Sequence, residues 1–184
     1  MKLRPAAEID ADFPDDAVVE GGDFVVFGGR GIAEALAEKF SALGYPIEPV
    51  EPEGHRGWTF VVAIDRKRVI FQATDFGGGE YLLTSYSGDF FTKADPERAK
   101  LLVQLNPELA RDPRFKRVRW VVEDDINGGT PGHSSPVDDE DLPALMNKAR
   151  KRAKNPPEPE AKDANGDGPT PRLLRRLLRI FGQR

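Results

Sequence analysis

The chain has 184 residues, of which 39% are apolar, and this suits one folded domain with extensions rather than two domains. Its 27 basic and 31 acidic residues give a net charge of -4, which argues against the whole molecule being a nucleic-acid binder. Cysteine is absent, which excludes disulfides, thiolate catalysis and zinc-finger sites.

The first 23 residues are predicted to form a polar, mobile acidic arm. They hold seven acidic residues against Lys2 and Arg4. They also lack the apolar run of a signal peptide, and no stretch of the chain approaches the roughly 20 apolar residues of a membrane span. We therefore expect a cytoplasmic protein.

A helix is predicted over residues 31–43, at the start of a folded domain that we place at 24–124. Apolar side chains recur there at helical spacing, and Gly44 closes the run. Residues 45–57 follow and are rich in proline, so they are expected to form an edge strand or an extended connection.

Three strands are predicted next, at 58–65, 68–75 and 80–87, because apolar and polar residues alternate and short turns separate the runs. A second helix begins at Asp95, which precedes a first-turn proline, and Pro107 is expected to break or restart it. A last strand covers 117–123.

These elements predict an α+β fold in which two main helices pack on one face of an antiparallel meander, in the order α-β-β-β-β-α-β. The apolar face of the sheet and the apolar sides of the two helices are expected to pack against each other. The predicted core is Leu36, Phe40, Trp58, Phe60, Val62, Leu102, Leu105 and Trp120.

Residues 125–169 are predicted to be a flexible linker, since glycine, proline and polar residues dominate them. A short charged helix is expected near 139–153, where acids lead and bases follow, as the helix dipole favours.

The glycine turn at Gly28, Gly29 and Gly31 resembles the start of a nucleotide-binding unit, because a strand precedes it and a helix follows. Glu48 lies near the spacing of a ribose-binding acid, but prolines flank it and hairpins follow in place of a parallel strand. We interpret the glycines as a tight turn into the helix. A small-ligand or nucleotide-binding enzyme at Gly28–Gly31 stays the alternative.

No catalytic, cofactor or metal site is predicted elsewhere. Residues 163–168 imitate a calcium loop, but Leu174 stands where the bidentate carboxylate is needed. The two histidines, His55 and His133, lie in polar loops. Two basic clusters, at 66–68 and 116–119, are explained equally well as a solvated turn and an edge strand.

The segment 170–184 is predicted to be a cationic amphipathic helix. At about 100° per residue, four arginines fall on one side and the leucines and Phe181 on the other. So short a helix needs an apolar surface, which leaves an anionic membrane, a partner protein and the protein's own domain open. The predicted contact residues are Arg172, Leu173, Arg175, Arg176, Leu177, Leu178, Arg179 and Phe181.

The element order around "GWTFVVAIDRKRVIFQATD" and "LVQLNPELARDPRFKRVRWVVEDD" resembles two groups of small bacterial proteins, the uncharacterised domains among polymorphic-toxin immunity proteins and the secretion-chaperone-like fold. The resemblance covers residues 24–124. It implies a binding module without catalysis.

The sequence therefore predicts a soluble, non-enzymatic bacterial module that binds another protein, without cofactor or nucleic acid. Segment 170–184 is expected to be a second contact, with a partner or at the inner face of the membrane.

Overall fold

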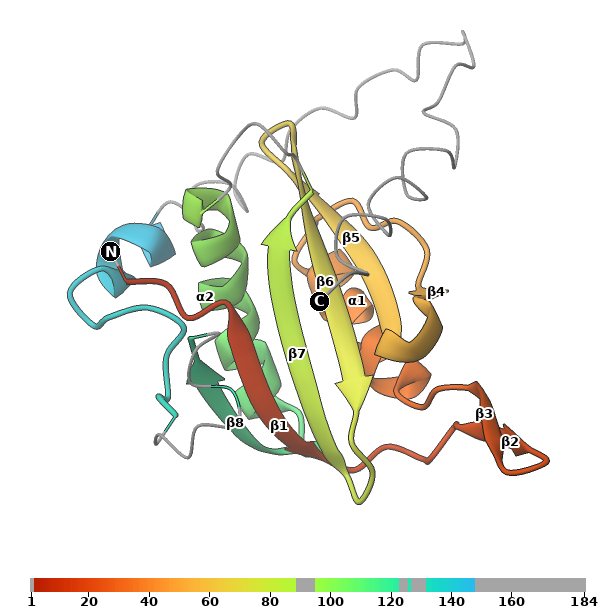
Figure 1. Cartoon of the computed structure of the whole chain (residues 1–184). Coiled ribbons are helices and arrows are strands. Elements are labelled where there is room, and N and C mark those ends of the chain that lie inside the picture. Colours follow the sequence, from red (N-terminus) through yellow and green to blue (C-terminus); the bar gives the residue numbers. More distant parts are fainter. Residues whose placement is uncertain (1, 89–94, 123–125, 127–131, 148–184) are drawn as a thin grey trace, which may run out of the picture.

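The computed structural model of this protein describes residues 2–88, 95–122, 126 and 132–147. Its main element is a six-stranded antiparallel sheet, with helices α1 (Arg30–Ala42) and α2 (Asp95–Arg111) behind it in Figure 1. Across the sheet the strands are β4 (Glu51–Pro52), β5 (Trp58–Ile64), β6 (Lys67–Asp75), β7 (Glu80–Ser87), β1 (Ala6–Ala11) and β8 (Phe115–Val121). A short ribbon of β2 (Val18–Glu20) and β3 (Asp23–Val26) stands apart from them. This confirms the predicted α+β class.

The predicted meander is confirmed as β5, β6 and β7, which pair in antiparallel register with Phe60 opposite Phe71. In β5 every second residue, from Trp58 to Ile64, is buried toward the helices. The intervening residues face away from the helices, so the period-2 pattern of the sequence determines which side of each strand is covered.

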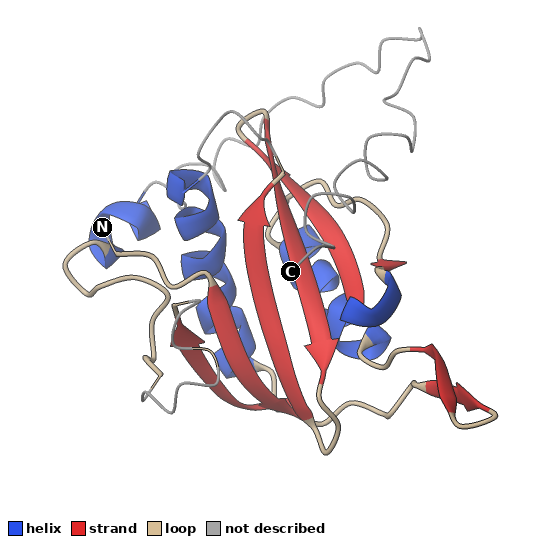
Figure 2. Cartoon of the chain, viewed as in Figure 1, coloured by secondary structure: helices blue, strands red, loops and turns tan. Residues whose placement is uncertain are grey.

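The eight predicted core residues all lie in one buried cluster between the sheet and the two helices, so this prediction is confirmed. Phe40 of α1 contributes a ring 4.7 Å from the ring of Phe71, measured between centroids. The two helices lie on one side of the sheet (Figure 2), as predicted.

The N-terminal segment is a strand, and the prediction of an acidic arm over residues 1–23 was wrong there. Residues Ala6–Ala11 form β1 between β7 and β8, inside the sheet. Ala7, Ile9 and Ala11 are buried on the helix side, while the acids at positions 8 and 10 occupy the other side. The segment therefore has one apolar side, which is buried, and one acidic side, which forms ion pairs.

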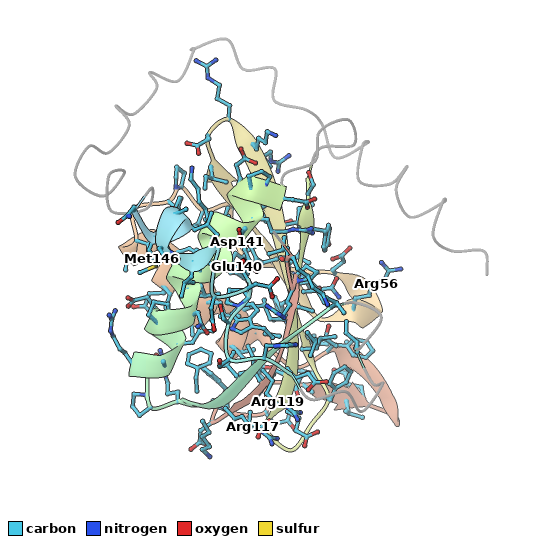
Figure 3. The ribbon with its side chains drawn as sticks, turned by 90° about the vertical axis from the view of Figure 1, so that its left-hand side faces the viewer. Arg56, Arg117, Arg119, Glu140, Asp141 and Met146 are labelled. Atoms are coloured by element: carbon cyan, nitrogen blue, oxygen red, sulfur yellow. The ribbon has the colours of Figure 1, made fainter. Side chains whose placement is uncertain are left out.

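The partners in these ion pairs are the basic residues of β8. Arg119 pairs with Glu8 at 2.6 Å, Arg117 with Asp10 at 2.7 Å and Lys116 with Asp12 at 3.5 Å. Figure 3 shows Arg117 and Arg119 next to each other on this edge of the sheet. The second basic cluster is also engaged, since Lys67 pairs with Glu97 and Arg68 with Glu48. The two clusters are thus largely neutralised by acids of the same chain.

Helix α2 runs without interruption through Pro107, contrary to the predicted break. Proline removes one helical hydrogen bond. Leu105 and Leu109, on either side of it, are fully buried, and Asn106 accepts a hydrogen bond from the Trp120 indole at 2.8 Å. These contacts hold the helix together across the proline.

Part of the predicted linker, residues 132–147, packs on the domain, which corrects the boundary at 124. The backbones of Trp120 and His133 exchange two hydrogen bonds, at 2.8 and 2.9 Å. Arg4, which is buried, forms an ion pair with the partly exposed Asp138 at 2.6 Å. Val137 and Leu145 join Ala99 and Val103 of α2 in a second apolar cluster.

The predicted charged helix is described only in part. Residues 142–147 are helical, and Met146 packs against the second apolar cluster, beside α2 in Figure 3. Residues 148–153 lie outside the described part of the chain, as do 123–125, the calcium-like loop at 163–168 and the whole of 170–184. None of the helices in the described part is both long and apolar enough to span a membrane.

Candidate functional site

The β2–β3 ribbon is a short hairpin that projects away from the sheet, at the end of the molecule where β6 turns into β7 (Figure 1). Gly21 and Gly22 connect its strands with φ angles of 62° and 96°. Two consecutive positive φ values are what a tight hairpin turn with the native strand twist requires. An isolated two-stranded hairpin is marginally stable in water. Contacts with another surface would therefore stabilise it.

Large apolar side chains are exposed at this same end. Val18, Val19 and Val25 of the hairpin are 42%, 54% and 57% exposed, and Phe76, in the β6–β7 turn, is 61% exposed. These four are the exposed large apolar residues of the described part of the chain. We call the hairpin, the glycine turn at 28–31 and the β6–β7 turn the hairpin end.

The glycine turn at the base of the hairpin is closed by a carboxylate of the same chain. Asp16 accepts hydrogen bonds from the backbone N–H of Gly29 at 2.6 Å and from that of Gly31 at 2.8 Å. Free amides at a helix N-terminus attract anions. Here Asp16 holds the place at the start of α1 that a phosphate group would need.

The glycine turn lies against the end of the neighbouring strand β6, and the backbone of Gly29 has a conformation that favours glycine. A Cβ on Gly28 would stand 2.5 Å from a carboxylate oxygen of Asp75, and Gly29 has a φ of 100°. The turn is therefore packed tightly against the end of β6. This contact links the base of the hairpin to the turn that carries Phe76.

Carboxylates give the hairpin end a negative potential. The pKa of Asp75 is raised, first by burial and then by the charges of Asp15 and Asp16. The pKa of Tyr81 is raised to about 12, again first by burial and then by the surrounding acids, Asp12 among them. Within the described residues, no group of three or more His, Asp or Glu side chains is placed to hold a metal ion.

Two arginines border this region, and each is engaged with an acid. Arg30 pairs with Glu34 at 2.7 Å, and Arg114 with Asp112 at 2.7 Å. The hairpin end therefore combines exposed apolar side chains with acidic ones, of which Asp12 is paired with Lys116. Such a surface suits a partner segment that is apolar on one side and basic on the other.

The predicted contact residues, Arg172 to Phe181, lie outside the described residues, so their place is not tested by the structure. The glycine turn lies at the hairpin end. The hairpin valines and Phe76 were not predicted as contact residues. The sequence "AVVEGGDFVVF" does carry a signal for them, because two apolar pairs flank a Gly-Gly turn.

No protein-family model, curated protein or solved structure was found to match this chain.

We expect NAD, NADP, FAD and ATP to leave the melting temperature of the protein unchanged. A nucleotide phosphate would have to displace the Asp16 carboxylate from the amides of Gly29 and Gly31 and approach Asp75. A ligand at 100 times its dissociation constant would add about 2.7 kcal/mol of stability, which a thermal-shift assay detects. A saturable shift that Gly31→Val abolishes would support the nucleotide-binding alternative instead.

Proposed function

We propose that this protein is a non-enzymatic protein-binding module and that its hairpin end is the contact surface. The observation that carries the proposal is the collection of Val18, Val19, Val25 and Phe76 at one end of the molecule. Single exposed apolar residues are common on soluble proteins, but several at the same end of a molecule favour an interaction site there.

The hairpin offers two means of contact. Its valines provide apolar area, and its backbone edges are available for added strands, since β2 and β3 pair with each other outside the main sheet. The acids around Tyr81 select against acidic partners and favour basic ones. The partner we propose is therefore a protein with a basic and apolar segment, as for an immunity-like or chaperone-like protein.

The nucleotide-binding alternative receives less support from the same residues. The amides that would bind a phosphate donate to Asp16, and the carboxylate of Asp75 lies next to Gly28. Segment 170–184, with its arginines and leucines on opposite sides, is the second part of the protein for which we propose contacts.

A photo-crosslinking amino acid at position 19, in full-length protein expressed in its source cell, is expected to give a discrete adduct. The same amino acid at Ser41, exposed at the other end of α1, is the matched control and should give none. Phe76→Ala should greatly reduce the adduct at position 19, because we propose that Phe76, exposed at the same end of the molecule, contacts the same partner. Equal adducts at both positions, or an adduct unaffected by Phe76→Ala, would contradict a contact surface at the hairpin end.

A further inference from the structure

We propose that the hairpin end is the docking site of the chain's own C-terminal segment, residues 172–181, which covers it when no partner is bound. The inference rests on the proposed role of the hairpin end as a contact surface, and it names one occupant. Three arguments support it: the chemistry of the two surfaces, the reach of the chain and the effective concentration that a covalent connection provides.

The two surfaces match in chemistry. Arg172, Arg175, Arg176 and Arg179 fall on one side of the segment and its apolar residues on the other. The hairpin end has exposed valines and Phe76, and the carboxylates of Asp15, Asp16 and Asp75 lie close enough to Tyr81 to raise its pKa. Apolar residues would meet apolar ones, while the arginines would meet carboxylates.

The chain is long enough to make this contact. The last described residues form the helix 142–147 beside α2, on the opposite side of the molecule from the hairpin (Figure 1). Residues 148–171 can span at most about 80 Å. A folded body of this size has a radius of gyration of only about 15 Å. The segment can therefore pass around the domain.

The tether makes even a weak contact effective. Two binding segments of one chain that can reach each other meet at an effective concentration on the order of 1 mM. A contact with a dissociation constant of about 100 μM would then be closed about ten times more often than open. A partner would compete with the segment for the hairpin end, so the segment would tune the affinity of the site.

An anionic membrane is a less suitable occupant of the same contact. The negative charge of the membrane attracts the arginines of the segment but repels the acids around Tyr81. The hairpin end would therefore take no part in membrane binding. Docking within the chain uses both surfaces.

A nitroxide spin label attached to Gln183→Cys in the full-length protein tests the inference, since the chain has no other cysteine. In a dilute, lipid-free sample, we expect the amide signals of Val18, Val19 and Val25 to be strongly broadened. The amides of Asp65 and Arg66, in the turn at the other end of β6, are the internal control and should stay sharp.

Variants of the segment separate its two sides. Leu177→Glu with Phe181→Glu should abolish the broadening. Arg175→Gln with Arg176→Gln should weaken it, and so should NaCl raised from about 0.1 M to about 1 M, which shortens the screening length from about 10 Å to about 3 Å. Lys162→Gln with Arg184→Gln removes two charges outside the segregated run and is the matched control, expected to leave the broadening unchanged.

Two results would overturn the inference. One is the absence of broadening at the hairpin, whether or not the protein sediments with phosphatidylserine vesicles. The other is broadening seen only when isotope-labelled protein is mixed with spin-labelled protein, because this places the segment on a second copy. Neither result affects the crosslink expected from position 19. The crosslinking experiment therefore tests the proposed function independently of this inference.

Discussion

Phe60→Ala is expected to lower the free energy of unfolding by about 3–5 kcal/mol, as measured by urea denaturation. Phe60 is 1% exposed, and its ring stacks on that of Phe71 with 5.3 Å between centroids. Phe40 of α1 adds a third ring at 6.2 Å. Truncation leaves a cavity where the sheet meets the helix, and the loss is a large part of the 5–15 kcal/mol that stabilises an ordinary domain.

Phe76→Ala is the matched control, because it removes the same atoms from a side chain that is 61% exposed. Its effect on stability should stay within about 0.5 kcal/mol, although it should reduce crosslinking at position 19. If Phe60→Ala does not fold, Phe60→Leu provides a milder form of the same measurement. Equal stability effects at positions 60 and 76 would contradict the packing described for the core.

Asp112→Asn is expected to cost about 3 kcal/mol at pH 7, the lower end of the range for breaking a buried ion pair. Asp112 follows α2 and pairs with Lys39, in the last turn of α1, at 2.8 Å. Both side chains are largely buried, at 12% and 14% exposed. The amide would leave the Lys39 ammonium without a charged partner there, and the link between α1 and the start of β8 would weaken.

The effect should depend on pH in one direction. The pKa of Asp112 is held well below its usual value, first by hydrogen bonds from Arg114 and also by Lys39. A carboxyl whose pKa is lowered by folding contributes stability above its unfolded pKa of about 3.9, and this stability is lost as the pH falls below that value. The difference between wild type and Asp112→Asn should therefore be full at pH 7 and shrink below about pH 4.

Glu34→Gln is the control for the ion pair, because Glu34 pairs with Arg30 at 2.7 Å with both side chains more than half exposed. Exposed pairs contribute about 0–1 kcal/mol. We expect Glu34→Gln to change the free energy of unfolding only slightly at pH 7. The difference from wild type should not show the decrease at low pH that is expected for Asp112→Asn. If Asp112→Asn proved no more costly than Glu34→Gln, the Asp112 pair would not contribute to stability as we describe.

The local sequence determined the elements whose signals repeat over a few residues. Alternation over 58–87 was sufficient for β5, β6 and β7, because their partners follow directly along the chain through short turns. Helical spacing of Leu36 and Phe40, and of Leu102 and Leu105, was sufficient for the buried faces of α1 and α2. These residues make up most of the core, so the fold class could be predicted.

The tertiary structure decided the features that depend on partners far away in the sequence. Glu8 and Asp10 look like a solvated charge run until β8 brings Arg119 and Arg117 opposite them, more than 100 residues later. Pairing at that distance leaves no local signal, because the residues of β1 taken alone are equally consistent with a polar arm.

The candidate site follows the same rule. Asp16 closes the glycine turn from 13 residues upstream of Gly29, and Asp75 packs on it from the end of β6. The sequence shows glycines before a helix, which fit a phosphate site and a tight turn alike. Only the folded chain places a carboxylate on those amides and leaves the hairpin valines exposed, because burial and hydrogen bonding are set by which segments meet in space.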